Sequence, residues 1–178
     1  MLDRARRSEQ EVLQAIEQSP LADRLAEQMT PAARLASSPP QASFLRGEWL
    51  SHALHPMLTD LPIGCWTSAT ILDLVGGRRS APAAQRLMGL GLILTPPTML
   101  SGLADWDRGR GDPAIRRAGA VHAAGNLVAS LLYLRSWQAR RRDNRRRGIV
   151  LGLVAMGVAS GAGYLGGHLA FSLGSGTR

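Results

Sequence analysis

The 178-residue sequence predicts an all-α fold, an integral membrane four-helix bundle preceded by an N-terminal amphipathic helical extension. Apolar residues make up 45% of the chain and are gathered into four long segments that are nearly free of charge. Each segment is close to the roughly 20 residues of helix that cross a bilayer. All 21 basic residues are arginines, and most lie at the ends of these segments. A soluble single domain or a disordered chain would not show this blockwise pattern.

A polar tail at residues 1–43 precedes the membrane domain at residues 44–178. In the tail, Val12, Leu13 and Ile16 recur at helical spacing, and a second apolar stripe follows a Ser-Pro break. We therefore expect two short amphipathic helices. They are predicted to lie on the membrane surface or to bind a partner protein, because their apolar faces are too small to form a core alone.

Four transmembrane helices follow from the apolar segments. They are predicted at residues 56–76, 86–105, 117–137 and 148–172. The fourth is rich in glycine at Gly-x-x-x-Gly spacing, which allows close approach of another helix. This helix is expected to be central to the bundle or to form a homo-oligomer contact. The sequence shows no convincing internal repeat, although the four helices would form two hairpins.

The arginines also predict the orientation. The loops at residues 77–86 and 135–147 together hold ten arginines. Seven others lie in the loop between them, shortly before the first span and after the fourth span. The positive-inside rule places these two loops in the cytoplasm and both termini outside. The arginines favour contact with anionic lipid rather than nucleic acid, since no nucleic-acid motif or aromatic interleaving accompanies them. The single cysteine, Cys65, says nothing about the redox compartment.

All four histidines are predicted to lie at one end of the bundle, because the connectivity alternates up and down. They are His52 and His55 before the first span, His122 early in the third and His168 late in the fourth. Asn126 follows His122 by one helical turn. Ionisable residues inside a membrane usually face a cavity or the bundle interior. This clustering is the main functional signal in the sequence.

Several roles fit these residues. Facing imidazoles among His52, His55, His122 and His168, with Asn126 nearby, would ligate a haem b axially. A single metal ion would instead be held by imidazoles and carboxylates. The candidate metal ligands are His55, His122, His168, Asp60 and Asp105. No cofactor is an equally plausible outcome, with the histidines bonded to carbonyls or to Asn126. Asp60 would then cap a helix or pair with an arginine, and Asp73 is expected to pair with Arg78 or Arg79.

At these residues the chain resembles a bacterial membrane family known as domain of unknown function 2231. The resemblance covers about residues 44 to 174. It is carried by Gly47-x-Trp49-Leu50-x-His52-x-x-His55-Pro56, Thr59-Asp60-Leu61-Pro62-Ile63-Gly64-x-Trp66-Thr67, Leu72-Asp73-Leu74, Ser101-Gly102-Leu103-Ala104-Asp105-Trp106, His122-x-x-x-Asn126 and Gly166-Gly167-His168-Leu169. The chain departs from the family pattern at Ser51 and Ala53, where Gly and Pro are expected. It also has Phe171-Ser172-Leu173 where relatives often carry Tyr-Arg-His.

The resemblance implies a multi-pass protein of the bacterial inner membrane. Members are sometimes joined to a Rieske iron-sulfur domain, which implies an association with redox proteins but identifies no activity. The leading hypothesis is therefore electron transfer through a haem or metal. A structural or assembly subunit that docks a redox or membrane-complex partner through residues 1–40 is the alternative, and a metal-dependent membrane hydrolase is the third.

Overall fold

The computed structural model describes residues 2–174, with side chains described from residue 7 onward. All of the regular secondary structure in this part of the chain is helical, so the predicted all-α class is confirmed. The helices are α1 (Leu2–Glu17), α2 (Pro20–Ala36), α3 (Gln41–Arg46), η1 (Glu48–Leu50), α4 (Leu54–Val75), η2 (Arg78–Ser80), α5 (Ala81–Gly109), α6 (Pro113–Arg141) and α7 (Arg145–Phe171). The predicted boundary at residue 44 falls inside α3.

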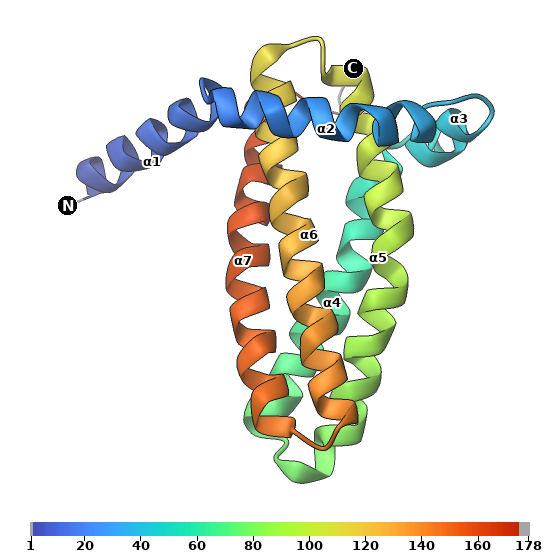
Figure 1. Ribbon diagram of the computed structural model, residues 1–178, viewed down its shortest axis with the longest axis vertical. Helices are drawn as coiled ribbons and strands as arrows, with labels where there is room; N and C mark the ends of the chain where they lie inside the picture. The colour runs from blue at the N-terminus through green and yellow to red at the C-terminus, as the bar shows by residue number, and fades with distance from the viewer. Residues whose placement is uncertain (1, 175–178) are drawn as a thin grey trace.

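The four long helices α4 to α7 lie side by side and alternate in direction (Figure 1). Neighbouring pairs are α4 with α5, α5 with α6, α6 with α7, and α7 with α4. Helices α4 and α6 therefore stand diagonally opposite each other and run in the same direction. Each predicted span falls on one of these helices. Side chains of α4 and α6 that point inward meet across the centre of the molecule.

Short polar segments start two of the long helices. Asp112 caps α6 by accepting hydrogen bonds from the amides of Ala114 (2.8 Å) and Ile115 (3.4 Å), and Pro113 takes the first helical position. Asn144 accepts from the amide of Arg147 (3.2 Å) at the start of α7. Such caps satisfy amides that have no partner within the helix. They explain why the chain reverses sharply at these points.

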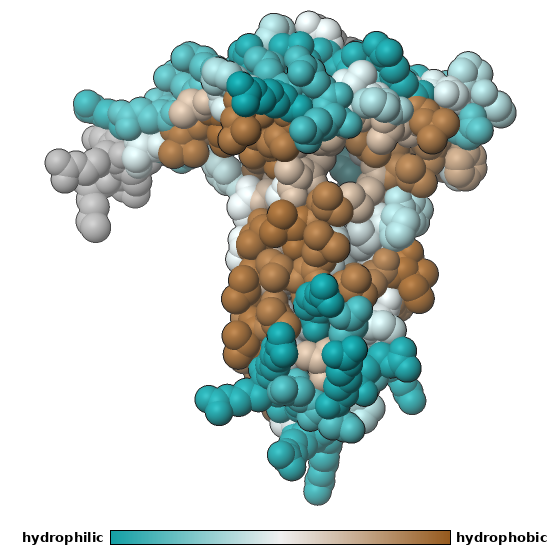
Figure 2. Space-filling view, viewed as in Figure 1, coloured by the Kyte–Doolittle hydropathy of each residue, from teal (hydrophilic) through white to brown (hydrophobic). Residues whose placement is uncertain are grey.

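On the face shown in Figure 2, an apolar belt covers the middle of the long helices between two hydrophilic ends. Exposed large apolar side chains occur on each of the four long helices, for example Ile71, Ile93, Val128 and Val154. Within residues 2–174, the segments Arg78–Gly109 and Arg145–Phe171 are long and apolar enough to cross a membrane. Exposed apolar belts of this extent are not expected on a soluble monomer.

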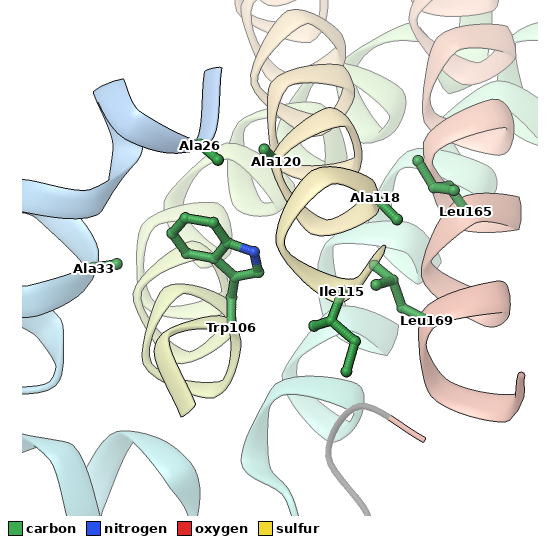
Figure 3. Packing of buried hydrophobic residues seen from close by; sticks show 8 residues of the cluster. All are labelled: Ala26, Ala33, Trp106, Ile115, Ala118, Ala120, Leu165 and Leu169. Atoms are coloured by element: carbon green, nitrogen blue, oxygen red, sulfur yellow. The ribbon is translucent and has the colours of Figure 1, made fainter. Parts of the chain in front are cut away.

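Helix α2 lies across one end of the long helices, and α1 projects to one side of them (Figure 1). The face of α2 that points inward is made of alanines: Ala22, Ala26, Ala33 and Ala36 are all at least 95% buried. These small side chains allow α2 to pack against the indole of Trp106, which lies between α2 and α6 (Figure 3). Thus α2 docks on its own chain. Binding of a separate partner through residues 1–40 stays a prediction.

Overpacking this alanine face should release the tail. We expect Ala33→Leu, at a position with 0% exposure, to weaken docking of α2 by about 1–3 kcal/mol, because the added atoms have no space. Tryptic cleavage after Arg24 and Arg34 in the detergent-solubilised protein should accelerate. The matched control is Ala32→Leu on the exposed face. Equal cleavage rates in both variants would contradict the docked arrangement.

An ion pair also holds the tail, and it should give the docking a pH dependence. The carboxylate of Asp23 forms ion pairs with guanidinium nitrogens of Arg117 at 2.8 Å and of Arg116 at 2.6 Å. The hydrogen bond from Arg117 and the charges of both arginines lower the pKa of Asp23 below its ordinary value of 3.8. A lowered pKa means that the carboxylate stabilises docking above pH 3.8 and that this contribution is lost as the pH falls through the lowered value. Hydrogen exchange of α2 amides should rise there, and Asp23→Asn should lack this step.

Candidate cofactor site

Two of the four histidines meet between the diagonal helices. His55 lies in the first turn of α4 and His122 lies in α6, and both side chains are half-buried. Their ring centroids are 6.4 Å apart and the ring planes are almost perpendicular, at 89°. One imidazole therefore comes from each of the two helical hairpins, α4–α5 and α6–α7.

A backbone carbonyl of the neighbouring helix fixes each imidazole. Nδ1 of His55 lies 2.9 Å from the carbonyl oxygen of Thr98 in α5. Nδ1 of His122 lies 2.7 Å from the carbonyl oxygen of Ala162 in α7. A carbonyl oxygen only accepts hydrogen bonds, so each neutral ring carries its proton on Nδ1 and presents the lone pair of Nε2. The amide nitrogen of Asn126 lies 3.1 Å from Nε2 of His122 and also donates to the carbonyl of that residue.

Each imidazole also packs against a glycine. A Cβ atom built on Gly102 would lie 2.7 Å from Cε1 of His55, and one built on Gly166 would lie 2.7 Å from Cε1 of His122. Real Cβ atoms essentially never approach another atom so closely. Each glycine follows the carbonyl acceptor of the same ring by one helical turn. A glycine is therefore required at both positions for the rings to keep these places.

Contacts between α4 and α6 across the long axis of the molecule keep one register along these two parallel helices. His55 and His122 are 67 residues apart in the sequence, as are Trp66 and Tyr133, and Asp73 and Arg140. Trp66 stacks on Tyr133 with ring centroids 3.9 Å apart. The three pairs share one spacing because α4 and α6 run in the same direction and rise equally per residue.

The third pair is a buried ion pair. Both carboxylate oxygens of Asp73 accept hydrogen bonds from Arg140, at 3.0 and 2.6 Å, and both side chains are at least 96% buried. Arg145 lies on the same carboxylate at 3.4 Å. The expected pairing of Asp73 with Arg78 or Arg79 is therefore wrong. The carboxylate points into the molecule, toward α6, and not along the chain to the loop.

The other candidate site residues lie apart from this pair. Nε2 of His168 binds the carboxylate of Glu17 in the tail at 2.7 Å. His52 and Asp60 are exposed, and Nδ1 of His52 lies 3.0 Å from the carbonyl of Leu50. Asp105 is half-buried in α5.

The five candidate metal ligands consequently do not assemble into one site. Within the described part of the chain, no group of three or more His, Cys, Asp or Glu side chains is placed to hold a metal ion. Residues at the same end of the molecule can still lie far apart. His168 faces the docked tail, whereas His55 and His122 face the long axis between the four helices. A location at the same end therefore does not bring these side chains into one site.

Residues 51–178 match a protein family described as predicted membrane protein, DUF2231. The chain belongs to this family. The DUF2231 match includes all four histidines, the helices α4 to α7 and the three residue pairs that meet between α4 and α6. It leaves α1, α2 and α3 outside. Comparisons with curated proteins and with solved structures find no match. The family description identifies a membrane protein and gives no activity, so a function for this DUF2231 protein has to be argued from its site.

Proposed function

We propose that this protein crosses the bacterial inner membrane four times as a four-helix bundle and binds one haem b between His55 and His122 for electron transfer. The observation that carries the proposal is the pair of imidazoles across the axis, one from each hairpin. Each has Nδ1 held by a carbonyl, and their ring centroids are 6.4 Å apart.

Helix length and surface support the four-span arrangement. Helices α4 to α7 contain 22, 29, 29 and 27 residues. At about 1.5 Å per residue each is longer than the roughly 30 Å hydrocarbon layer. The apolar belt of Figure 2 covers their middle on the face shown, and each of the four helices carries exposed large apolar side chains. The arginine-rich turns after α4 and α6 favour a cytoplasmic location for that end, with the histidines and both termini outside.

The ligand set favours haem over a single metal ion. A structural zinc site takes four protein ligands and a catalytic one usually takes three, whereas the iron of a haem needs only axial groups from the protein. His55 and His122 would hold such a haem, and their ring centroids lie 6.4 Å apart. The haem would supply one-electron redox chemistry. Binding of the iron would replace the hydrogen bond from Asn126 to Nε2 of His122.

The groups that contact each imidazole also have the arrangement expected around a ligating histidine. Ligating histidines generally donate their other ring nitrogen to a carbonyl or carboxylate, which fixes the ring and raises its basicity. Thr98 and Ala162 supply such carbonyls. The glycines Gly102 and Gly166 prevent the rings from being displaced by a side chain. Because both histidines lie near one end, the haem would exchange electrons at one membrane surface.

An absorption spectrum tests the proposal. The full-length protein is expressed with a haem precursor, purified in detergent, and recorded oxidised and after reduction with dithionite. We expect a Soret band and sharp reduced α and β bands. The variants His55→Ala and His122→Ala should both lose the low-spin spectrum, because each removes one axial ligand. His52→Ala, at an exposed position, is the matched control and should keep it. A colourless wild-type protein under these conditions would refute haem binding.

A further inference from the structure

An arginine pocket lies at the end opposite to the histidines. It has a volume of about 690 Å³ and lies between η2, the start of α5 and the turn from α6 to α7. Five arginines line it: Arg78, Arg86, Arg140, Arg145 and Arg146. This end is the lower one in Figure 1 and forms the lower hydrophilic surface of Figure 2.

The pocket carries an excess of positive charge. Five guanidinium groups face only two carboxylates: Asp143 in the lining, and Asp73 beneath Arg140 and Arg145. Within residues 7–174, no salt bridge engages Arg78, Arg86 or Arg146. The Nε atom of Arg145 is buried and lacks a hydrogen-bond partner in this part of the structure. A group that enters the pocket with negative charge would therefore balance the excess positive charge of the arginines.

The first turn of α5 forms one wall of the pocket. Ser80 precedes this helix, but its hydroxyl donates to the carbonyl of Gly76 (3.1 Å) and makes no side-chain cap. The amide of Ala81 donates to the carbonyl of Arg78, and Pro82 has no amide hydrogen, so this turn offers the pocket no backbone donor from these two residues. Ala81 and Pro82 of this turn line the pocket together with the arginines.

The surroundings indicate an amphiphile. Ile149 belongs to the lining, and the exposed Val150 and Val154 continue from it along α7. On α5, Leu90 and Ile93 are exposed one and two turns beyond Arg86. A molecule with its anionic group in the pocket would therefore lay its hydrocarbon chains on the apolar belt. A soluble phosphate has no hydrocarbon chains and would not contact these apolar side chains.

We infer that the arginine pocket binds the phosphate groups of an anionic phospholipid headgroup, with a two-phosphate lipid preferred. The inference depends on the membrane location of the protein and is independent of haem binding at the other end. Basic pockets between transmembrane helices on the cytoplasmic side commonly take such headgroups. The arginines provide planar, bidentate donors suited to phosphate oxygens.

Lipid-dependent thermal stability tests the inference. The full-length protein in detergent micelles is titrated with cardiolipin, phosphatidylglycerol, phosphatidylcholine or inorganic phosphate, and the midpoint of unfolding is followed. We expect stabilisation in the order cardiolipin, phosphatidylglycerol, phosphatidylcholine. The double variant Arg86→Gln with Arg146→Gln should bind cardiolipin about tenfold to thirtyfold more weakly. Neither arginine takes part in the Asp73 ion pair, so the fold should be retained.

The matched control removes two exposed arginines of the same turn that lie outside the pocket. Arg142→Gln with Arg147→Gln changes the net charge equally. It should leave cardiolipin affinity within about twofold, because distance and salt screen these charges. An equal loss in both double variants would overturn the pocket in favour of diffuse charge attraction. Stabilisation by inorganic phosphate equal to that by cardiolipin would overturn the lipid as the source of the phosphate.

Discussion

Asp73→Asn should be among the most destabilising single substitutions in the protein. The amide cannot neutralise Arg140, whose side chain is 4% exposed and makes two hydrogen bonds to the Asp73 carboxylate. Breaking a buried ion pair by removing one partner typically costs about 3–5 kcal/mol, because the remaining charge stays buried and unpaired. Arg145 would lose the same partner. We expect a large fall in the midpoint of thermal unfolding in detergent.

Two further variants make this result specific. Asp60→Asn removes the same charge from the same helix at an exposed position, and it should change stability little. The double variant Asp73→Asn with Arg140→Gln removes both buried charges, so it should recover much of the loss. An Asp73→Asn protein as stable as Asp60→Asn would show that the two side chains do not form a buried pair.

Gly166→Ala should have the second large effect, on cofactor binding. A methyl group at this position would lie 2.7 Å from Cε1 of His122, so the imidazole must move away from α7. The movement breaks the bond from Nδ1 to the Ala162 carbonyl and shifts the ring off the axis. Loss of an outer-shell partner typically costs about 10–100-fold in affinity at a metal site. Haem retained per protein after purification, measured by the pyridine haemochrome assay, should fall accordingly.

Gly163→Ala provides the matched control in the same helix. A Cβ at Gly163 would meet nothing within 4 Å, and alanine favours helix over glycine by about 1 kcal/mol. This variant should therefore keep its haem and be at least as stable as wild type. Gly102→Ala should reproduce the effect of Gly166→Ala through His55, since its contact is equally close. Full haem retention in both Gly102→Ala and Gly166→Ala would place the cofactor away from these rings.

Topology gave limited information about which histidines lie close together. Alternating helix directions were enough to bring His55 and His122 to one end, and the structure places them in contact across the axis. The same argument included His168, which instead binds Glu17 of the tail. Which residues share an end depends on connectivity, whereas which residues touch depends on how each helix is rotated. Long apolar helices that are hydrophobic all round give no periodicity from which that rotation can be predicted.

The helical class, the approximate ends of the long helices, the membrane family and the arginine-rich turns could be predicted from the amino-acid sequence. They follow from local composition, since apolar length, helix caps and loop charge are properties of short segments. The docking of α2, the Asp73–Arg140 pair and the packing of His55 and His122 against Gly102 and Gly166 became visible only in the folded structure. These contacts join residues that are far apart in the sequence. They depend on the rotation and spacing of helices, which packing of the whole molecule determines.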